Sequence, residues 1–284
     1  MSSRNPAALA LAMLATAACT LSPSVGQNQG ESQAPAADAG PDAAAPVTMQ
    51  LLALAGFNGQ LESQTSRSSA GDTTVTGGLP LIASYFKSDR ERNPNTVAVM
   101  SGDSLGVSSV LSSYFGELPT VEAMGLLGIV ADTPGKHPFN LGTEKMTALY
   151  QQAPFTTVAT NLGNVPENFG ASVKSPYHLV EVGPDKVKVA FLGIHNQALV
   201  QSIFPGKMGS VTIREPVSAA TTAAREARAA GASVVVGLTT MDANRETAGV
   251  VGQLADFARQ VEGIDVLVGR AYRATELAET IHGT

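Results

Sequence analysis

Short apolar segments rich in β-branched residues recur along most of this chain, and stretches with helical spacing separate them. The apolar segments span 47–55, 96–100, 156–160, 187–193, 233–238 and 265–268. Apolar residues follow a helical period over 79–93, 121–127, 144–152, 216–230 and 250–261. Strands that alternate with helices predict a layered α/β fold with buried sheets.

The first 19 residues have the features of an export signal. Arg4 gives them a positive charge near the start, an apolar run follows over 7–18, and they end at Cys19, the single cysteine of the chain. The run is too short to span a bilayer as a stable anchor. Small residues before the cysteine are typical of a signal peptide. We therefore predict that residues 1–19 direct export.

The ending Thr16-Ala17-Ala18-Cys19 resembles a bacterial lipobox, in which the cysteine is lipidated and becomes the mature N-terminus. The alternative is an ordinary signal peptide in which Cys19 has no role. Thr20 follows the cysteine where an inner-membrane sorting signal has Asp, so the expected location is the outer membrane. We predict a membrane tether through a lipid on Cys19.

Composition separates a linker from the folded body and excludes one class of partner. Residues 20–46 are rich in Ser, Gln, Gly, Pro and Ala without apolar periodicity, which predicts a flexible linker. Residues 47–284 form the expected domain. The net charge is −6, only 15% of residues are charged, and no basic run is present. These features argue against nucleic acid as a partner.

Three motifs in the body have a characteristic order and spacing. Gly77-Gly78 precedes a helical stretch that ends in Asn93-Pro94, and a strand then leads to Gly102-Asp103. Residues 135–142 read GKHPFNLG, and the strand FTTVATN follows at 155–161. This series resembles the calcineurin-like metallophosphoesterases, in the branch of the bacterial 5′-nucleotidases and 2′,3′-cyclic phosphodiesterases.

The resemblance implies a four-layer α/β/β/α sandwich. It also implies a centre of two divalent metals, such as Mn or Zn, which clamp a phosphate while a bound hydroxide attacks it. The family's domain continues beyond its last histidine motif, whereas this sequence ends soon after that point. We therefore expect a sandwich without its last strands, either because the chain is a fragment or because the domain has degenerated.

Most metal-ligand positions of the family are substituted here. Gly56 and Asn58 stand where the first Asp-x-His motif has its two ligands, and Lys136 stands where the family has Asn. Thr240 stands at the His position of the later Leu-Ser-His motif. Arg270 stands at the first His position of the final Gly-His-x-His motif. These substitutions predict that the dinuclear site is not formed.

Two ligand remnants and one histidine survive. Asp103 is the clear remaining metal ligand, Asn58 is a weak one, and His137 keeps the family's catalytic histidine without an orienting carboxylate, because Asn140 replaces it. A single carboxylate does not hold a divalent ion in a catalytic geometry. Lys136 places a positive charge at a metal position, where pairing with Asp103 is one of its options.

The basic side chains allow a different interpretation of the same region. Lys136, Arg270 and Arg273 are candidates for an anion-binding pocket. The alternative is ordinary ion pairing of these residues with Asp103, Asp242 or Glu246, and the sequence does not decide between the two.

The leading hypothesis is a catalytically degenerate, 5′-nucleotidase-like lipoprotein that acts as a binding or assembly component at the cell envelope. It needs no cofactor, and it has a protein partner there. One alternative is a metal-dependent phosphohydrolase, a nucleotidase or phosphodiesterase, with a rearranged site. Another is a metal-free anion-binding protein.

Overall fold

Two β-sheets form the centre of the molecule. The structure is a computed structural model, and it describes residues 15–19, 47–69, 71–166, 175–247 and 249–271, with only the backbone at 15–19 and 271. The first sheet has the order β1-β2-β5-β6-β7, and the second has the order β13-β12-β10-β9 with β14 also paired to β12. The first sheet contains β1 (Ala15–Cys19), β2 (Met49–Leu54), β5 (Thr96–Met100), β6 (Ile129–Asp132) and β7 (Thr156–Thr157). The second contains β9 (His178–Val182), β10 (Val187–Ile194), β12 (Val234–Glu246), β13 (Gly249–Val251) and β14 (Val266–Ala271).

Alternate residues of the strands divide the core into layers. In β5, Val97 and Val99 face the second sheet, whereas Ala98 and Met100 face helices. Because successive side chains of a strand point to opposite faces, both faces of each sheet are buried. The core between the sheets is aliphatic apart from Phe191, which is fully buried.

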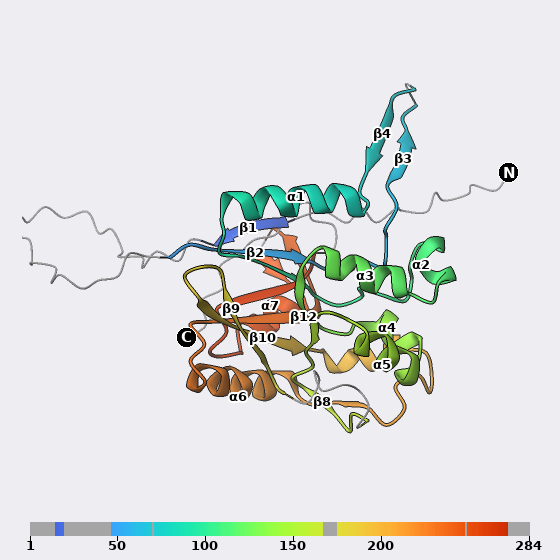
Figure 1. The fold of residues 1–284 in the computed structure, drawn as a ribbon. Helices are drawn as coiled ribbons and strands as arrows, with labels where there is room; N and C mark the ends of the chain where they lie inside the picture. Colours follow the sequence, from blue (N-terminus) through green and yellow to red (C-terminus); the bar gives the residue numbers. More distant parts are fainter. Residues whose placement is uncertain (1–14, 20–46, 70, 167–174, 248, 272–284) are drawn as a thin grey trace, which may run out of the picture.

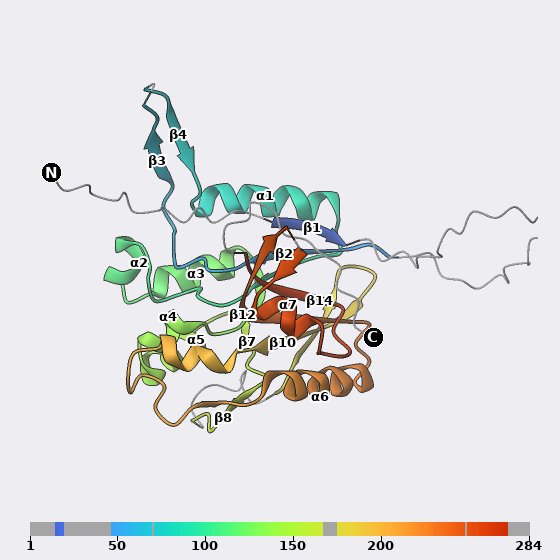
Figure 2. The same cartoon turned by 180° about the vertical axis from the view of Figure 1, so that it is seen from behind.

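Helices cover the outer face of each sheet (Figures 1 and 2). The helices on the side of the first sheet are α1 (Leu79–Arg92), α2 (Val110–Tyr114), α3 (Leu118–Leu126), α4 (Lys136–Asn140) and α5 (Thr143–Gln151). The second sheet is covered by α6 (Pro216–Ala229) and α7 (Gln253–Ala258), and the 3₁₀ helix η2 (Gln197–Ser202) lies beside α4. The layers are therefore helix, sheet, sheet and helix, which confirms the predicted fold class.

Local sequence signals explain where the two longest helices begin. Pro80 and Pro216 stand in the first turns of α1 and α6, where a missing backbone N–H costs nothing. The carboxylate of Glu215 accepts hydrogen bonds from the N–H groups of Val217 and Ser218. These bonds, that of Ser218 first, lower the pKa of Glu215 and stabilise the start of α6.

Two small sheets lie outside the sandwich. The strands β3 (Gln64–Arg67) and β4 (Thr73–Thr76) form an antiparallel hairpin that projects from the body (Figure 1). The strands β8 (Leu162–Gly163) and β11 (Thr212–Ile213) pair beneath α5 and α6. Within the described ranges, no helix is both long and apolar enough to cross a membrane.

The observed elements correct several predicted ones. The predicted helix over 250–261 begins as strand β13, and α7 starts only after Gly252, whose φ of 105° favours glycine. Strand β12 extends to Glu246, well past the predicted end at residue 238, because it pairs with β13. The strands β6 and β9 and the β3–β4 hairpin were not predicted at all.

Candidate functional site

The loops that follow β2 and β5 are joined by backbone hydrogen bonds. The N–H groups of Gly56, Asn58 and Gly59 donate to the carbonyls of Gly102, Asp103 and Ser104, at 3.1, 2.8 and 2.9 Å. Because β2 and β5 are parallel, their carboxyl ends meet at one edge of the sheet. The Gly56 loop and the Gly102 loop are therefore fixed side by side at the edge where the family's metal ligands are expected.

Asp103 is a buried carboxylate held in an uncommon backbone conformation. Its φ is 50°, in the left-handed region, and its side chain is only 6% exposed. Its Oδ1 accepts the backbone N–H of His137 at 2.9 Å. A Cβ on Gly135 would lie 2.1 Å from that Oδ1, so glycine is required where the two loops approach. Asp103 thus stabilises the start of the His137 segment.

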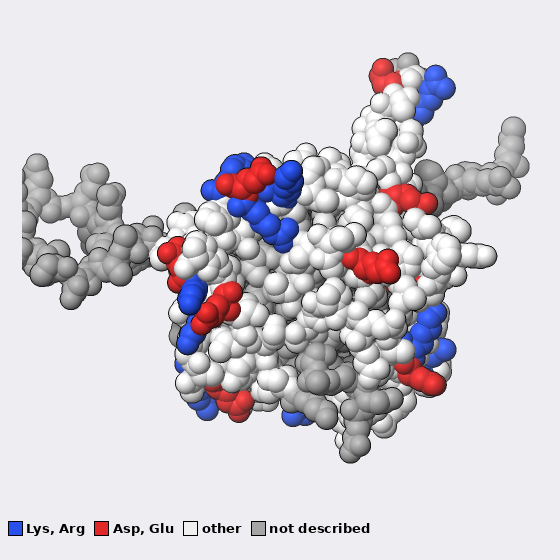
Figure 3. Space-filling view, in the orientation of Figure 1, with Lys and Arg blue, Asp and Glu red and all other residues white. Residues whose placement is uncertain are grey.

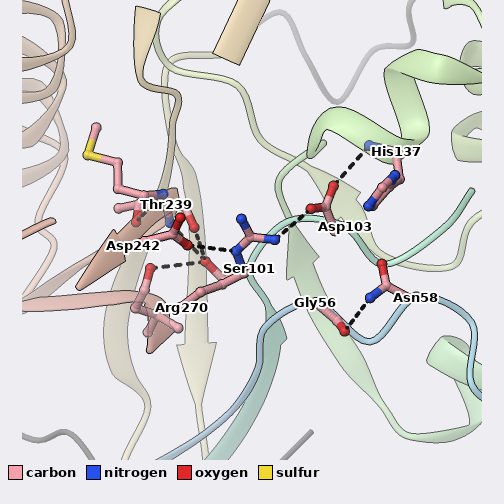
Figure 4. Close-up of polar contacts among 10 residues, drawn as sticks. Gly56, Asn58, Ser101, Asp103, His137, Thr239, Asp242 and Arg270 are labelled. Atoms are coloured by element: carbon pink, nitrogen blue, oxygen red, sulfur yellow. Dashed lines mark hydrogen bonds and ion pairs between the residues drawn. The ribbon is translucent and has the colours of Figure 1, made fainter. Parts of the chain in front are cut away.

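Arg270 occupies the centre of the candidate site. One guanidinium N–H donates to Asp103 Oδ2 at 2.9 Å, and Nε donates to Asp242 Oδ1, also at 2.9 Å (Figure 4). Arg270 lies on β14, Asp242 on β12 and Asp103 after β5, so one side chain joins both sheets. The Arg270 side chain is 27% exposed. Charge-assisted bonds of this kind are among the stronger polar contacts in proteins.

The absence of a side chain at position 56 leaves room for this arginine. A Cβ on Gly56 would lie 3.6 Å from Cδ of Arg270, so the arginine stem passes directly beside the glycine. Gly56 stands where the resemblance expects an Asp ligand, and Arg270 stands where it expects a His ligand. The two substitutions fit one another sterically, because a longer side chain at position 56 would project toward the arginine.

Lys136 does not pair with Asp103. Arg270 takes that carboxylate instead, and among the described residues no carboxylate lies within ion-pairing distance of Lys136. Arg270 lies on β14 at a position from which its guanidinium contacts both Asp103 and Asp242. Lys136 lines a hollow of about 310 Å³ together with Asp103, Thr240, Asp242 and Arg270.

His137 has its backbone, rather than its imidazole, engaged in the site. Burial lowers its pKa, the negative charge of Asp103 opposes that shift, and Lys136 and Arg270 add to it. Its predicted partner position, Asn140, bonds elsewhere, because Asn140 Oδ1 accepts the backbone N–H of Phe204 at 2.8 Å. Within the described part of the chain, no carboxylate therefore orients the His137 ring as the family chemistry requires.

Asn58 is held by its amide nitrogen, and its oxygen points toward Asp103 (Figure 4). Its amide nitrogen donates to the carbonyl of Gly56 at 2.9 Å, within its own loop. Its Oδ1 and the hydroxyl of Thr240 are buried without a hydrogen-bond partner in the described ranges. Among the described residues, no group of three or more His, Cys, Asp or Glu side chains is placed to hold a metal ion. With both carboxylates bound to Arg270, the donor set does not fit a pair of divalent metals.

A serine beneath the site connects the two sheets. The Ser101 hydroxyl accepts the backbone N–H of Thr239 at 2.8 Å, and it lies 2.9 and 3.0 Å from the carbonyl oxygens of Thr239 and Val268. Ser101 is fully buried. It donates to one of these carbonyls and thereby satisfies polar backbone groups between the sheets.

Two further buried ionisable groups lie at neighbouring strand ends, and the sequence did not single them out as a site. Asp132 ends β6 and accepts hydrogen bonds from the hydroxyls of Ser104 and Tyr150, at 2.6 and 3.3 Å. Burial raises the pKa of Asp132 to about 7. His195 follows β10, and burial lowers its pKa to about 4. The hydrogen bond between His195 Nε2 and the carbonyl of Pro134, at 2.7 Å, fixes the orientation of that neutral ring.

The structure thus brings together Asp103, Lys136, His137, Asn58 and Arg270 in one region. Asp242, which the sequence suggested as an ion-pair partner or as a ligand of a rearranged metal site, is an integral part of it. Arg273 lies outside the described residues. So does the side chain of Cys19, and the lipid attachment stays a prediction.

Comparisons with known proteins agree with the fold. No family model matches the chain. It is 26% identical over 237 residues to Endonuclease YhcR of Bacillus subtilis, which covers 78% of this chain and 19% of that protein. It is 26% identical over 215 residues to the trifunctional nucleotide phosphoesterase protein YfkN of the same organism, covering 69% and 14%. Cell wall protein Lmo0130 of Listeria monocytogenes is 28% identical over 178 residues, covering 54% and 22%.

A solved structure has the same architecture. The 5′-nucleotidase precursor from Thermus thermophilus superposes with a TM-score of 0.66 at 23% identity, covering 78% of this chain and 41% of that one. The chain spans a fifth or less of the length of YhcR and YfkN. The resemblance to the 5′-nucleotidases is confirmed: the relatives include a nucleotide phosphoesterase, the structural neighbours include a 5′-nucleotidase and a calcineurin-like phosphoesterase, and together they support a metallophosphoesterase domain of that family.

Proposed function

We propose that this chain is a non-catalytic relative of the 5′-nucleotidases that acts as a binding or assembly component at the cell envelope. The observation that carries the proposal is the position of Arg270 between Asp103 and Asp242. In this arrangement a side-chain cation takes the place that the family's chemistry gives to metal ions.

The electrostatics of the site favour the arginine over a metal. A divalent ion at Asp103 would have to displace the guanidinium from both carboxylates, and the displaced charge would stay nearby. Lys136 adds a second positive charge to the same hollow. Like charges at such short range repel strongly where water is partly excluded. His137, without an orienting carboxylate among the described residues, is then left without a metal-bound substrate to protonate.

We propose that the protein is exported across the cytoplasmic membrane and acts in the cell envelope. The relatives include a cell wall protein and a nucleotidase precursor, which is consistent with an exported protein. A lipid on Cys19 and a linker over 20–46 would tether the domain to the envelope, in the outer membrane by the residue that follows Cys19. A protein partner there would replace the lost enzymatic role.

One observation favours the anion-binding alternative. Lys136 makes no ion pair with the described residues, and it faces a hollow that hydroxyl and amide groups also line. Arg270 weakens this alternative, because its charge is already matched by two carboxylates. Phosphate binding without metal, measured by calorimetry, would support the anion-binding function over the assembly function.

The test of the proposal is metal content. The full chain is incubated with excess manganese, desalted and measured by elemental analysis, beside the variant Gly56→Asp/Asn58→His/Arg270→His, which restores three of the family's ligand types. We expect no bound manganese on the natural chain and a gain of metal on the variant, because the variant removes the competing cation. Asp tolerates the left-handed backbone at position 56 better than most residues.

About two ions on the natural chain would contradict the proposal and favour the phosphohydrolase alternative, since two-metal sites are the working form of such enzymes. Hydrolysis of a nitrophenyl phosphate ester would then be measured directly. Gain of metal by the variant alone shows that the assay detects the site when its ligands are present.

A further inference from the structure

One end of the molecule carries an exposed apolar surface, which we name the α2 patch. It consists of Val107, Val110, Leu111, Tyr114, Phe115 and Leu118, and each of these side chains is exposed. Val110 and Tyr114 are the most open, at 81% each. The exposed area is on the order of 600 Å², at the upper limit of what soluble monomers usually leave uncovered. Such a patch typically marks an interaction site.

The α2 patch rests on a fixed base. Glu117 is buried at 3% exposure and its carboxylate accepts hydrogen bonds from the hydroxyls of Ser108 and Ser112. Ser112 is also bonded to the hydroxyl of Thr120 at 2.6 Å. Of the α2 residues, only Ser112 therefore faces inward, and the apolar residues face solvent. This orientation is the reverse of the usual one for a surface helix.

The β3–β4 hairpin at the same end lacks a surface to rest on among the described residues. All four residues of β3 and the first three of β4 are exposed, including Val75 at 61%. A two-stranded hairpin is marginally stable at best when nothing packs against it. Its threonine-rich strands have high β-propensity and open hydrogen-bonding edges, which favour pairing with another surface. Figures 1 and 2 both show the hairpin rising at the end that holds α2.

The charge distribution at this end permits contact between like molecules. The chain is acidic overall, yet the hairpin from 63 to 78 carries only Arg67 and Asp72, which balance. Residues 104–121 carry a single charge, that of the buried Glu117. In Figure 3 the projection at the position of α2 is white, without charged side chains. Contact between these two segments would therefore bring no exposed net charge together, although the exposed carboxylates of Glu62 and Glu122 flank them.

We propose that this end binds a second copy of the chain, with the β3–β4 hairpin of each copy lying across the α2 patch of the other. The inference rests on the assembly role proposed above and names its partner. A second copy supplies both missing elements at once, a cover for the patch and a base for the hairpin. A two-fold axis repeats the contact, so two patches bury about 1,200 Å², the lower bound of a specific interface, before the hairpins add their share.

The first experiment measures mass in solution. Sedimentation velocity over a concentration series compares the full chain with Val110→Asp/Tyr114→Asp and with the control Phe204→Ser. Phe204 is 63% exposed but lies outside the patch. We expect a dimer for the natural chain and the control, and a monomer for the double variant, because two buried carboxylates would oppose association. A dimer that persists in the double variant would overturn the proposal, because it would show association through another segment, such as the apolar run at 7–18.

The second experiment tests the exchange of hairpins. In a Cys19→Ser background, chains carrying Val75→Cys are mixed with chains carrying Tyr114→Cys under mild oxidation. We expect a covalent heterodimer in the mixture and little covalent dimer from either variant alone, since the proposed contact joins position 75 to position 114. Equal cross-linking of each variant with itself would contradict the arrangement.

A monomer at every concentration would overturn the proposal, and binding of that monomer to neutral phosphatidylcholine vesicles would assign the patch to a lipid surface instead. Neither result bears on the metal site. Conversely, manganese binding would overturn the non-catalytic function and leave the dimer standing.

Discussion

The Arg270 site and the α2 patch differ in how their side chains are satisfied. At the site, Arg270 is bound to two carboxylates, and Asp103 also accepts the N–H of His137. At the patch, Val110 and Tyr114 are largely exposed and contribute little to the folded monomer. The polar groups of the Arg270 site are thus matched within the fold, whereas the apolar side chains of the α2 patch are left open to solvent, as the proposed contact between copies requires.

The largest expected effect comes from removing the arginine. Arg270→Ala leaves Asp103 buried without its arginine partner, so we expect the free energy of unfolding to fall by about 3 kcal/mol. This value is at the lower end of the range for a buried ion pair, because Asp242 is partly exposed. Chemical denaturation measures this. Tyr114→Ala, studied at a dilution where the protein is monomeric, should change stability by less than about 0.5 kcal/mol. Equal losses of stability in the two variants would show that Arg270 contributes no more to the folded monomer than the exposed Tyr114 does.

A double-mutant cycle measures the interaction free energy between Arg270 and Asp103. Arg270→Ala/Asp103→Ala removes the unpaired carboxylate together with the arginine, so the double variant should lose less than the two single losses added together. Additive losses would mean that the ion pair contributes nothing to the fold.

The second effect concerns the contact between the sheets. Ser101→Ala leaves the buried N–H of Thr239 without its acceptor, and we expect a loss of about 2 kcal/mol. The matched control is Ser113→Ala on the exposed surface of α2, whose hydroxyl bonds within its own turn. Thermal unfolding of both variants measures the difference, and a similar Tm for the two would show that the Ser101 contacts do not hold the sheets together.

The smallest net effect is the pH dependence of the natural chain, because two opposite slopes cancel there. The pKa of Asp132 is raised to about 7, so its contribution to stability is lost as pH rises from about 4 to 7. The pKa of His195 is lowered to about 4, so its contribution is lost as pH falls from about 6.5 to 4. Between these values the two slopes, each at most about 1.4 kcal/mol per pH unit, oppose one another.

Single variants separate the two slopes. Relative to the natural chain, Asp132→Asn should make stability rise with pH between about 4 and 6.5, and His195→Gln should make it fall over the same range. Urea denaturation at a series of pH values measures both. Identical pH profiles for the natural chain and both variants would show that neither group titrates differently in the folded state.

Much of the site was predictable because strand ends are marked in the sequence. Gly102-Asp103 after a β-rich segment placed Asp103 at a sheet edge, and residues 135–142 placed Lys136 and His137 opposite it. The choice of partner was not predictable, because Asp103 and Arg270 are separated by 167 positions and only strand pairing fixes their distance. The shifted pKa values of Asp132 and His195 could not be predicted for the same reason, because burial between packed elements is not a local property.

The solvent exposure of the α2 patch could not be predicted from the sequence. Apolar residues in a short segment predict a core position, yet Val110, Tyr114 and Phe115 face solvent, because Ser112 and Glu117 turn the polar side of the segment inward. No periodicity in five helical residues distinguishes these two orientations.

The alternation of strands and helices and the layered fold could be predicted from the sequence, because periodicity and turn residues are properties of single segments. The prediction that the family's metal ligands are substituted likewise rests on the identity of single residues. Only the tertiary structure decided which side chain occupies the centre of the site. Asp103, Asp242 and Arg270 come from three different strands or strand ends, and the pairing of β12 with β14 sets two of these residues opposite one another. Charge satisfaction depends on distances of about 3 Å across the fold, and no local pattern encodes such distances.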